Sequence, residues 1–588
     1  MFLARKAIVT ELFLACHMAA KLVSEFATTT PHHNPSLPRI CVMSAKITTK
    51  FGRAGPPAPR HAVTVYMGSD WESGVEYGTD AASVIARFYD AYPRMKPHRD
   101  IVQLSDAVMK HLGSLDKACL LFPSLQSARE CGDYATSSRR NDGIDNCPVA
   151  VEDVTIRAFV AKEAFFAVIF PAVQYHVVVG FWKMVGAGIT SRFAEANCAH
   201  LDELRQVALE DAASNRDGFE CAAHETLRRR ILSLVQRAAL RPDVSSRVTT
   251  GDIYLYQSGM ASIYKPHTYM LNQYQGASVL FGMSFMDTIL TLEQFGPGST
   301  FFGCGSEQDL VELESHLGTS RSGGQKVQAI WVEFPANPLL RSPDIAELRR
   351  LATAHDAVLV IDDTIGSWAN TDVLAMADMT VTSLTKSFNG YADAIGGAAI
   401  LNPASAKYAA LKALFDAQYV PEMHVLDAET FERNSRDYLP RSARLNANAS
   451  AVVAYLRARA QDPDSSVRRV HYPSVSDTYR AFMRPATADF APGYGCLLSV
   501  EMADLDAARA FYNNLDVHKG VHFGAPFTLA IAYAVCVYLK KEEWAARFGL
   551  KQTQIRIAIG LEDTDALLED FRVAVEAADQ AKSTGSSQ

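Results

Sequence analysis

The sequence lacks the residue patterns that mark several classes of protein. Its ten cysteines form no C-x-x-C pair and no zinc spacing, so we predict neither a disulfide framework nor a metal site. Two apolar stretches do not predict membrane spans. Polar side chains interrupt residues 7–22, and residues 527–539 are too few to cross a bilayer. The net charge of −8 provides no basic surface for nucleic acid or anionic membranes. Scattered thiols are typical of reducing compartments, so we expect a cytoplasmic protein.

What is present is an ordinary globular composition. The 588 residues are 48% hydrophobic and 21% charged, which allows two or three domains. Residues 1–60 are rich in Thr, His and Pro, and we predict that they form a disordered tail and linker. We expect a second disordered tail at 581–588. The triplet Met43-Ser-Ala suggests the hypothesis that translation begins at Met43, which sequencing of the N terminus tests.

The chemically richest stretch is residues 380–397, which surround Lys386. A β-branched, apolar run ends at Ser383, and a glycine-punctuated loop then leads to the apolar residues 398–401. This pattern predicts a strand, a reactive loop and a second strand. Lysine forms Schiff bases when burial or a cationic neighbour lowers its pKa and frees the amine. For a lysine considered alone, a surface position is the more common alternative.

An acidic residue at the end of an apolar run raises the significance of that lysine. Residues 358–361 are all apolar, and Asp362 follows them, 24 residues before Lys386. This pattern predicts a buried parallel strand with a carboxylate at its C-terminal end, the edge where open α/β sheets bind ligands. Pyridoxal phosphate (PLP) sites need both groups: a Schiff-base lysine, and an acid that keeps the pyridinium nitrogen charged.

Three motifs carry a family resemblance. The segments D-D-T at 362–364, S-L-T-K at 383–386 and N-G-Y-A-D-A-I-G-G at 389–397 resemble the cystathionine synthase and lyase family, the PLP enzymes of cysteine and methionine metabolism. The similarity is greatest to long fungal-type cystathionine gamma-synthases, from about His61 to Glu576. It implies an α/β fold, that of the fold-type I, aspartate-aminotransferase-like transferases, with a mostly parallel sheet.

The resemblance also implies a division into domains. We predict an N-terminal extension domain at 61–244, a large PLP-binding domain at 245–435 and a smaller C-terminal α+β domain at 436–580. Shorter family members lack the extension, for which we expect a structural or interaction role. Family members are homodimers or homotetramers that bind small amino-acid substrates, without nucleic acid or membrane partners.

The resemblance further assigns residues that bind the cofactor. The turn S-G-M-A places Ser258, Gly259 and Met260 at a helix N terminus, where backbone amides bind phosphate. Ser383 and Thr385 would add hydroxyl donors. In the motif E-x-P-x-N-P at 333–338, Asn337 would hydrogen-bond the phenolic oxygen of PLP, whereas Glu333 is assigned a structural role; an ordinary turn is the alternative for Asn337.

Two positions are inferred from less specific patterns. The resemblance gives Phe285 a catalytic position, where its ring would stack on the pyridine and most family members have a tyrosine that helps proton transfer. Core packing is the alternative for Phe285. In the family, a tyrosine and an arginine two residues later bind the phosphate across the dimer interface. Thr190 and Arg192 would occupy these positions here, and a capping or surface role is the alternative for Arg192.

Two further residues are assigned to the substrate. Arg556 lies inside the predicted strand at 554–562, where an unpaired charge is costly, and the resemblance gives it the substrate α-carboxylate as partner. His522 replaces a serine of the fungal-type synthases in the loop at 519–524. It would reshape the pocket or act as an acid or base near neutral pH, and a surface histidine is the alternative.

The resemblance implies a reaction but leaves alternatives. We expect γ-replacement on an O-acylhomoserine, for trans-sulfuration and methionine biosynthesis or for specialised metabolism. Lys386 would hold PLP and remove the α-proton of the substrate, and a thiol or another nucleophile would replace the γ-substituent. The alternatives are a lyase that eliminates without a nucleophile, and a non-catalytic relative in which the extension binds or regulates.

Overall fold

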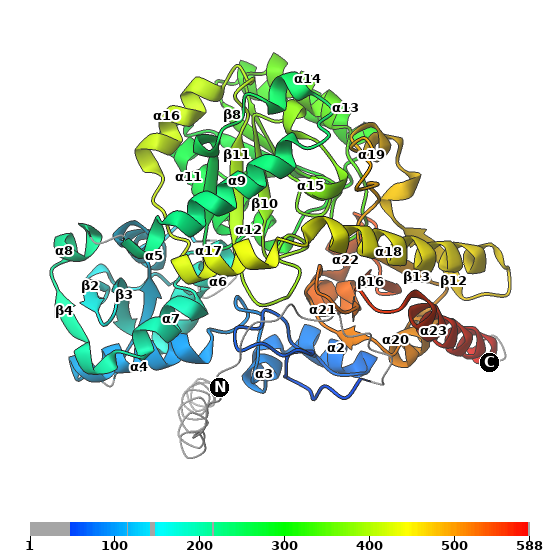
Figure 1. Cartoon of the computed structure of the whole chain (residues 1–588), viewed down its shortest axis with the longest axis horizontal. Coiled ribbons are helices and arrows are strands. Elements are labelled where there is room, and N and C mark those ends of the chain that lie inside the picture. The colour runs from blue at the N-terminus through cyan, green and yellow to red at the C-terminus, as the bar shows by residue number, and fades with distance from the viewer. Residues whose placement is uncertain (1–46, 115, 141–146, 215–216, 586–588) are drawn as a thin grey trace.

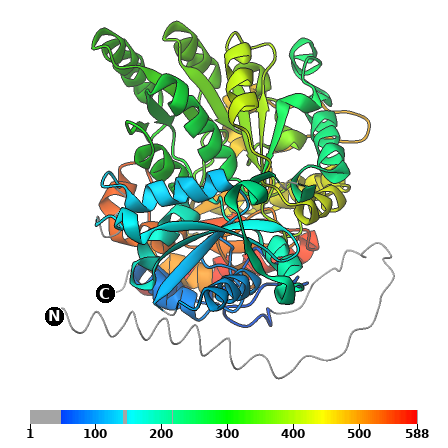
Figure 2. The ribbon, with the colours of Figure 1, turned by 90° about the vertical axis from the view of Figure 1, so that its left-hand side faces the viewer.

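Three β-sheets organise the computed structural model of this chain, which describes residues 47–114, 116–140, 147–214 and 217–585 (Figure 1). The largest sheet has seven strands, the C-terminal sheet five and the N-terminal sheet four. Figure 2 looks onto the N-terminal sheet and its helices, with the large sheet above them. The hypothesis of a start at Met43 concerns residues outside the described ranges.

The seven-stranded sheet is mostly parallel, as predicted. Its spatial order is β5 (Ile253–Tyr256), β11 (Gly397–Leu401), β10 (Met379–Ser383), β9 (Val358–Asp362), β8 (Val327–Glu333), β6 (Ala277–Phe281) and β7 (Ser299–Phe302). Only β11 runs antiparallel to its neighbours. Side chains alternate between two apolar clusters: Trp331 packs on one face, and Ile330 and Val332 pack on the other. Burial on both faces explains the continuous apolar runs of these strands.

Helices cover both faces of this sheet. The helices α11 (Ala261–Tyr274) and α16 (Tyr408–Gln418) pack on the face of Trp331, and α13 (Glu307–Ser322) and α14 (Ile345–Ala354) pack on the other. Asp344 caps α14 by accepting hydrogen bonds from two amides of its first turn. The alternation of strands and helices along the chain therefore predicts the layers correctly.

The C-terminal sheet is mixed and has helices packed on one apolar cluster. Its order is β12 (Val467–His471), β13 (Leu497–Met502), β16 (Gln554–Ala558), β15 (Leu529–Ile531) and β14 (His518–Lys519). The packed helices are α18 (Tyr438–Gln461), α20 (Leu505–Asn514) and α23 (Thr564–Gly585). The apolar stretch at residues 527–539 forms β15 and the short helix α21 (Tyr533–Tyr538). One expectation fails here, because α23 extends into the predicted disordered tail at 581–588.

The N-terminal sheet is antiparallel and stands beside the large sheet. Its order is β1 (Lys117–Phe122), β3 (Ala164–Pro171), β2 (Thr155–Val160) and β4 (Arg205–Val207). The helices α5 (Leu125–Thr136) and α6 (Tyr175–Val185) cover one face, and α4 (Arg99–Leu112) and α7 (Ser191–Cys198) cover the other. Phe165 and Phe166, adjacent on β3, point into these two different clusters.

The segment before α4 packs elsewhere than expected. Trp71, the first residue of α2 (Trp71–Thr79), is 1% exposed and belongs to the apolar cluster of the C-terminal sheet. Met67 donates its amide hydrogen bond to the carbonyl of Lys519. Residues 62–66 form no strand, and residues 47–60 are ordered, with the amide of Gly52 bonded to the carbonyl of Tyr66. This segment buries its apolar side chains against the C-terminal part, which no local pattern encodes.

Residues 47–585, outside the short gaps, contain no helix with the length and apolar character that a membrane span requires.

Candidate active site

The site lies at one edge of the large sheet. β9 and β10 are parallel neighbours, so their C-terminal ends meet at the same edge, and Val381 pairs with Asp362 across them. Asp362 ends β9, and Lys386 follows three residues after the end of β10. The loop is closed by the hydroxyl of Thr385, which donates to the carbonyl of Gly396 at 3.2 Å and accepts its amide at 3.1 Å. The sequence pattern predicted this strand, loop and strand.

A cavity of about 570 Å³ opens at this edge. It brings together predicted residues from six segments of the chain: Ser258, Gly259, Met260, Phe285, Asn337, Asp362, Ser383, Thr385, Lys386 and Arg556. Tyr77, Ile85, Met95, Val521 and Phe523 add apolar and aromatic walls. A mostly apolar cavity with a few convergent polar groups is the usual form of a cofactor or ligand site.

The amine of Lys386 is desolvated at the bottom of this arrangement. It donates a hydrogen bond to the hydroxyl of Tyr92 at 3.3 Å and lies 3.5 Å from Nδ1 of His522. The rings of Tyr92 and Phe523 lie 5.0 and 4.8 Å from the nitrogen. Burial lowers the pKa of Lys386, and Arg556 and Arg94 add repulsion, although Tyr92 opposes the shift. The nitrogen is therefore prepared for nucleophilic attack or proton abstraction.

Arg556 projects from β16, and its positive charge has no carboxylate partner among the described residues. Its side chain bonds Oδ1 of Asn337 at 3.2 Å and the carbonyl of Val521 at 2.5 Å. No carboxylate among the described residues forms an ion pair with it, although it is only 4% exposed. Burial lowers the pKa of Arg556, but a guanidinium remains charged at physiological pH. The arrangement suits an incoming carboxylate, which would supply the missing counter-charge.

The residues at this edge fit PLP. A Cβ added to Gly259 would lie 2.6 Å from Oγ of Ser383, so only glycine lets the turn and the strand end approach this closely. The hydroxyl of Ser258 already donates to the carbonyl of Gly186 at 2.8 Å and shapes the turn. Burial raises the pKa of Asp362, which a positively charged ring nitrogen would counter. An acid for the ring nitrogen, an amine for the Schiff base and a glycine turn for the phosphate are the groups that this cofactor needs.

Glu333 fixes two of the predicted residues from β8. Its carboxylate accepts the amide of Phe285 at 2.6 Å and that of Asn337 at 3.1 Å. Burial, with the charge of Asp362, raises the pKa of Glu333 to about 8. The side-chain amide of Asn337 donates to the hydroxyl of Tyr533 at 3.3 Å. These contacts are consistent with the structural role expected for Glu333.

Sequence reasoning missed two residues that line the cavity, Tyr92 and Arg94. Arg94 forms an ion pair with Asp287, and its guanidinium lies 5.2 Å from the ring centre of Phe285. A usable signal was present, because a tyrosine and an arginine two residues later occur literally at 92–94. The prediction placed this pair at Thr190 and Arg192 instead.

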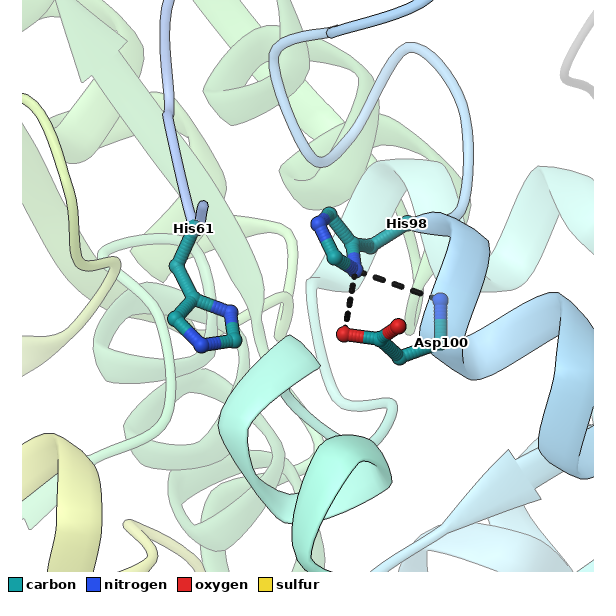
Figure 3. A group of neighbouring side chains, drawn as sticks. All are labelled: His61, His98 and Asp100. Carbon is teal, nitrogen blue, oxygen red and sulfur yellow. Dashed lines mark hydrogen bonds and ion pairs between the residues drawn. The ribbon is translucent and has the colours of Figure 1, made fainter. Parts of the chain in front are cut away.

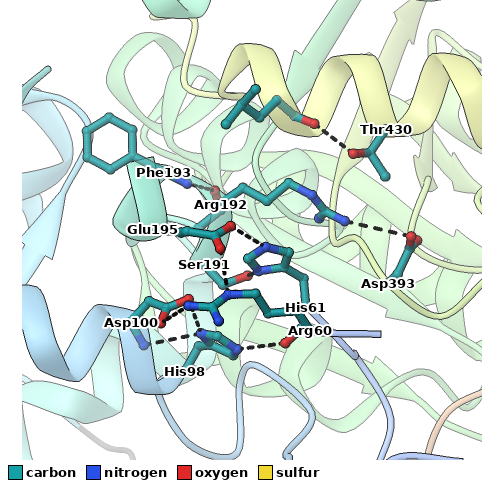
Figure 4. A network of polar contacts seen from close by, with 12 residues as sticks. Arg60, His61, His98, Asp100, Ser191, Arg192, Phe193, Glu195, Asp393 and Thr430 are labelled. Carbon is teal, nitrogen blue, oxygen red and sulfur yellow. Dashed lines mark hydrogen bonds and ion pairs between the residues drawn. The ribbon is translucent and has the colours of Figure 1, made fainter. Parts of the chain in front are cut away.

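The structure places Thr190 and Arg192 outside the cavity of this chain. Thr190 caps α7 and donates its hydroxyl hydrogen bond to Asp427. Arg192 pairs with Asp427 at 3.3 Å and with Asp393 at 3.7 Å (Figure 4). Both side chains therefore connect α7 with α17 (Val425–Asn434), and Arg192 also connects it with the loop after Lys386. Two carboxylates thus satisfy Arg192 within this chain, and its contact with the cofactor phosphate of a neighbouring subunit stays a prediction.

His522 also differs from expectation. It is 1% exposed and contacts Lys386, but it is not among the residues that line the cavity. Burial lowers the pKa of His522 well below its usual value, and the charges of Lys386 and Arg556 add to the shift. This shift favours the neutral imidazole near pH 7, because the ring is desolvated between cations. Its burial does not fit the surface alternative, and a part of His522 in shaping the pocket or in proton transfer stays a prediction.

A cluster of His61, His98 and Asp100 lies next to Arg192, with ligand-type atoms within 4.8 Å of one another (Figure 3). These atoms bond protein groups: His61 contacts Glu195 at 2.8 Å, and His98 contacts Asp100 at 3.3 Å (Figure 4). Arg60 binds Asp100 at 2.8 Å and brings a positive charge into the cluster. We assign it a structural role, because the charge repels a cation and the contacts join residues 60–61 to α4 and α7.

Comparisons with known proteins agree with this site. The chain matches the model of Cys/Met metabolism PLP-dependent enzymes over residues 236–576 and that of the fungal trans-sulfuration N-terminal domain over 100–190. It is 33% identical to alanine racemase ungC of Aspergillus violaceofuscus, covering 89% of this chain and 96% of the relative. It is 31% identical to a cystathionine gamma-synthase of Neurospora crassa, covering 90% and 99%.

A solved structure shows the same fold. The cystathionine gamma synthase of Xanthomonas oryzae superposes with a TM-score of 0.50 at 20% identity, covering 62% of this chain and 88% of that one. The fold-type I architecture is thereby confirmed, and PLP is the cofactor that characterises the matched family. The chain therefore belongs to the Cys/Met metabolism family of PLP-dependent enzymes.

Proposed function

We propose that the chain catalyses PLP-dependent γ-replacement on an O-acylhomoserine-type amino acid. The observation that carries the proposal is the meeting, in one cavity, of a desolvated amine on Lys386, an unpaired guanidinium on Arg556 and a buried carboxylate on Asp362. The relatives named cystathionine gamma-synthase support the substrate class. Cytoplasmic location and a homodimeric or homotetrameric state remain predictions, the latter tested by light scattering.

Each of these residues has a separate task in the proposal. Arg556 binds the substrate α-carboxylate through two parallel hydrogen bonds and fixes the Cα–H bond relative to Lys386. The amine of Lys386 removes the α-proton as a general base. Bound PLP supplies the electron sink for the electrons of the broken C–H bond. The amides of Ser258, Gly259 and Met260 would hold its phosphate, and the hydroxyl groups of Ser383 and Thr385 would bind it from the other side.

The remaining assigned residues position the ring. Asp362 would keep the ring nitrogen charged, Asn337 would bond its phenolic oxygen, and Phe285 would stack on its face. Phe285 has no hydroxyl and moves no proton, so its role is limited to packing. The cavity wall of Tyr77, Met95 and Val521 excludes water from the carbanionic carbon.

A second candidate is racemisation at Cα, and a lyase is a third. The relative with 33% identity is named an alanine racemase, and racemisation needs the same α-proton abstraction without any leaving group. A lyase eliminates the γ-substituent and needs no nucleophile. All three share Lys386 and Arg556, and they differ in the steps after the first proton transfer.

The test uses purified protein with PLP and three substrate mixtures. An O-acetyl- or O-succinyl-homoserine is incubated with and without cysteine, and L-alanine is incubated in deuterium oxide, with products followed by mass spectrometry and chiral chromatography. Cystathionine that appears only with cysteine supports γ-replacement. Oxobutyrate in both mixtures indicates the lyase, and D-alanine carrying deuterium indicates the racemase. Lys386→Ala should abolish the visible absorbance of bound PLP, and a variant that keeps it would contradict every candidate.

A further inference from the structure

The hydroxyl of Tyr92 lies within hydrogen-bonding distance of the Lys386 amine, and both residues line the cavity. It accepts a hydrogen bond from the amine at 3.3 Å, and its own side chain lines the cavity. Tyr92 comes from the segment between α3 (Ala81–Ala86) and α4, about three hundred residues before the lysine in the chain. Its placement beside the amine is therefore a product of tertiary packing.

The other groups near the amine are less suited to exchange a proton with it near neutral pH. His522, at 3.5 Å, is held neutral by burial between cations, and its Nε2 has no hydrogen-bond partner that could take up a proton. Arg94 and Arg556 are guanidinium groups and keep their protons. Asp287 is neutralised by its ion pair with Arg94.

Tyr92 differs from these neighbours because its proton is labile. Burial alone would raise the pKa of Tyr92, but the positive charges of Lys386 and Arg94 outweigh this effect and lower it. Most other buried tyrosines of the chain have raised pKa values, among them Tyr77 and Tyr533 of the same cavity. Tyr92 is thus a phenol whose electrostatic surroundings favour release of its proton.

We propose that Tyr92 is a catalytic acid–base partner of Lys386, which carries the α-proton onward to the reacting substrate. The amine takes the proton from Cα and becomes an ammonium, while the electrons of that bond stay with the substrate. The phenol of Tyr92 gives its own proton to the leaving group or to a substrate carbon. The phenolate then takes a proton from the ammonium, which restores the neutral amine and the phenol. Protons and charges balance over the cycle.

This proposal rests on the proposed function, since it needs Lys386 to act as the base. It adds a route by which the abstracted proton leaves the ammonium of Lys386 through Tyr92. Without this route, the amine could only return the proton to the carbon from which it came. The route serves γ-replacement and elimination, where a leaving group needs a proton, and it serves racemisation, where the proton must be replaced. The inference therefore concerns the shared chemistry and not the choice among these reactions.

The first experiment reads the ionisation of Tyr92 without catalysis. The full-length chain, freed of PLP, is titrated from pH 6 to 12 while tyrosinate absorbance is followed at 295 nm. We expect one of the 22 tyrosines to ionise before the rest, and Tyr92→Phe to remove that early component. Lys386→Met should move the component to higher pH, because a positive charge is lost. An early component that persists in Tyr92→Phe, or is absent from the unmodified chain, overturns the proposal.

The second experiment measures turnover of the PLP-loaded enzyme. Tyr92→Phe should lower kcat by roughly 10²- to 10⁴-fold, the usual contribution of a general acid–base group, with little change in KM or PLP affinity. The matched control is Tyr89→Phe, since Tyr89 lies in the same segment and is 45% exposed. Loss of PLP affinity with unchanged kcat would show that Tyr92 only holds the cofactor. Inactivity of the unmodified enzyme, by contrast, counts against the proposed function and not against this step.

Discussion

Positive charge dominates the cavity at the scale of single residues. Lys386, Arg94 and Arg556 are all desolvated there, and only Arg94 has a carboxylate ion-pair partner among the described residues. An unpaired buried cation is costly, so the free protein keeps this arrangement at the expense of stability. The expense is understandable if anionic ligands complete the site: a phosphate and a carboxylate would supply the missing charges.

We predict that Arg556→Gln raises the KM for the amino acid substrate. A hydrogen bond to a charged group contributes ~1.5–3 kcal/mol, so the increase should be roughly 10- to 150-fold. Steady-state kinetics with saturating PLP measures it. The matched control is Arg468→Gln, at an exposed position of β12. An Arg556→Gln enzyme with unchanged KM would show that the carboxylate binds elsewhere.

At the scale of elements, the cofactor edge depends on how closely two backbones approach. The turn before α11 meets the end of β10, and the gap between Gly259 and Ser383 leaves no room for a Cβ. α11 continues into the apolar face of the sheet, where its His267 donates to the carbonyl of Phe295 at 2.9 Å and packs edge-on against Trp331. A change in this helix therefore affects the cofactor edge and the core together.

We predict that Gly259→Ala weakens PLP binding by at least about tenfold. The added Cβ displaces the turn, and the displacement costs at least the free energy of one hydrogen bond. Fluorescence titration of the PLP-free chain with PLP measures the affinity. Gly318→Ala is the matched control, since an added Cβ in the middle of α13 meets nothing within 4 Å. That substitution should raise stability by ~0.5–1 kcal/mol, as alanine does in helix interiors.

We predict that His267 contributes to acid unfolding. Burial lowers the pKa of His267 to about 4, against 6.5 for an exposed histidine. The unfolded chain therefore binds the proton first, and stability falls as pH decreases from 6.5 toward 4, by ~1.4 kcal/mol per pH unit for this one group. His267→Gln retains an N–H donor but does not titrate. Denaturant unfolding at several pH values should show a smaller loss in the variant; equal losses would count against the assignment.

At the scale of the whole molecule, a buried polar network connects the N-terminal domain with the large sheet and its helix α11. Glu422 accepts hydrogen bonds from Ser124 and Ser127 of the N-terminal domain and from Gln257, the residue before the S-G-M-A turn. Lys265 of α11 pairs with Glu130 of α5 at 2.7 Å and lies 3.8 Å from Glu422. The extension thus contacts the elements that carry the predicted cofactor residues, and its structural or interaction role stays a prediction.

We predict that Lys265→Met destabilises the protein by ~3–5 kcal/mol, because it leaves the charge of Glu422 buried without a cation. Denaturant unfolding followed by tryptophan fluorescence measures the change. The double variant Lys265→Met/Glu422→Gln removes both charges and should recover part of the loss. If the two substitutions are simply additive, Lys265 and Glu422 are not energetically coupled.

The sequence by itself determined the layers of the large sheet and the two residues at its functional edge. Apolar runs that are buried on both faces are local patterns of the sequence. Two parallel neighbouring strands end at the same edge of a sheet, so they place Asp362 and Lys386 together independently of the other segments. The structure accordingly places both Asp362 and Lys386 in the lining of one cavity.

Only the tertiary structure decided which distant segments complete the cavity. Tyr92 and Arg94 reach it because the segment before α4 packs on the C-terminal part, guided by the burial of Trp71, and no spacing encodes that contact. The same holds for Arg192, whose charge is taken by Asp393 and Asp427, far along the chain. Local patterns fix the elements, but the partners of a buried charge depend on long-range packing.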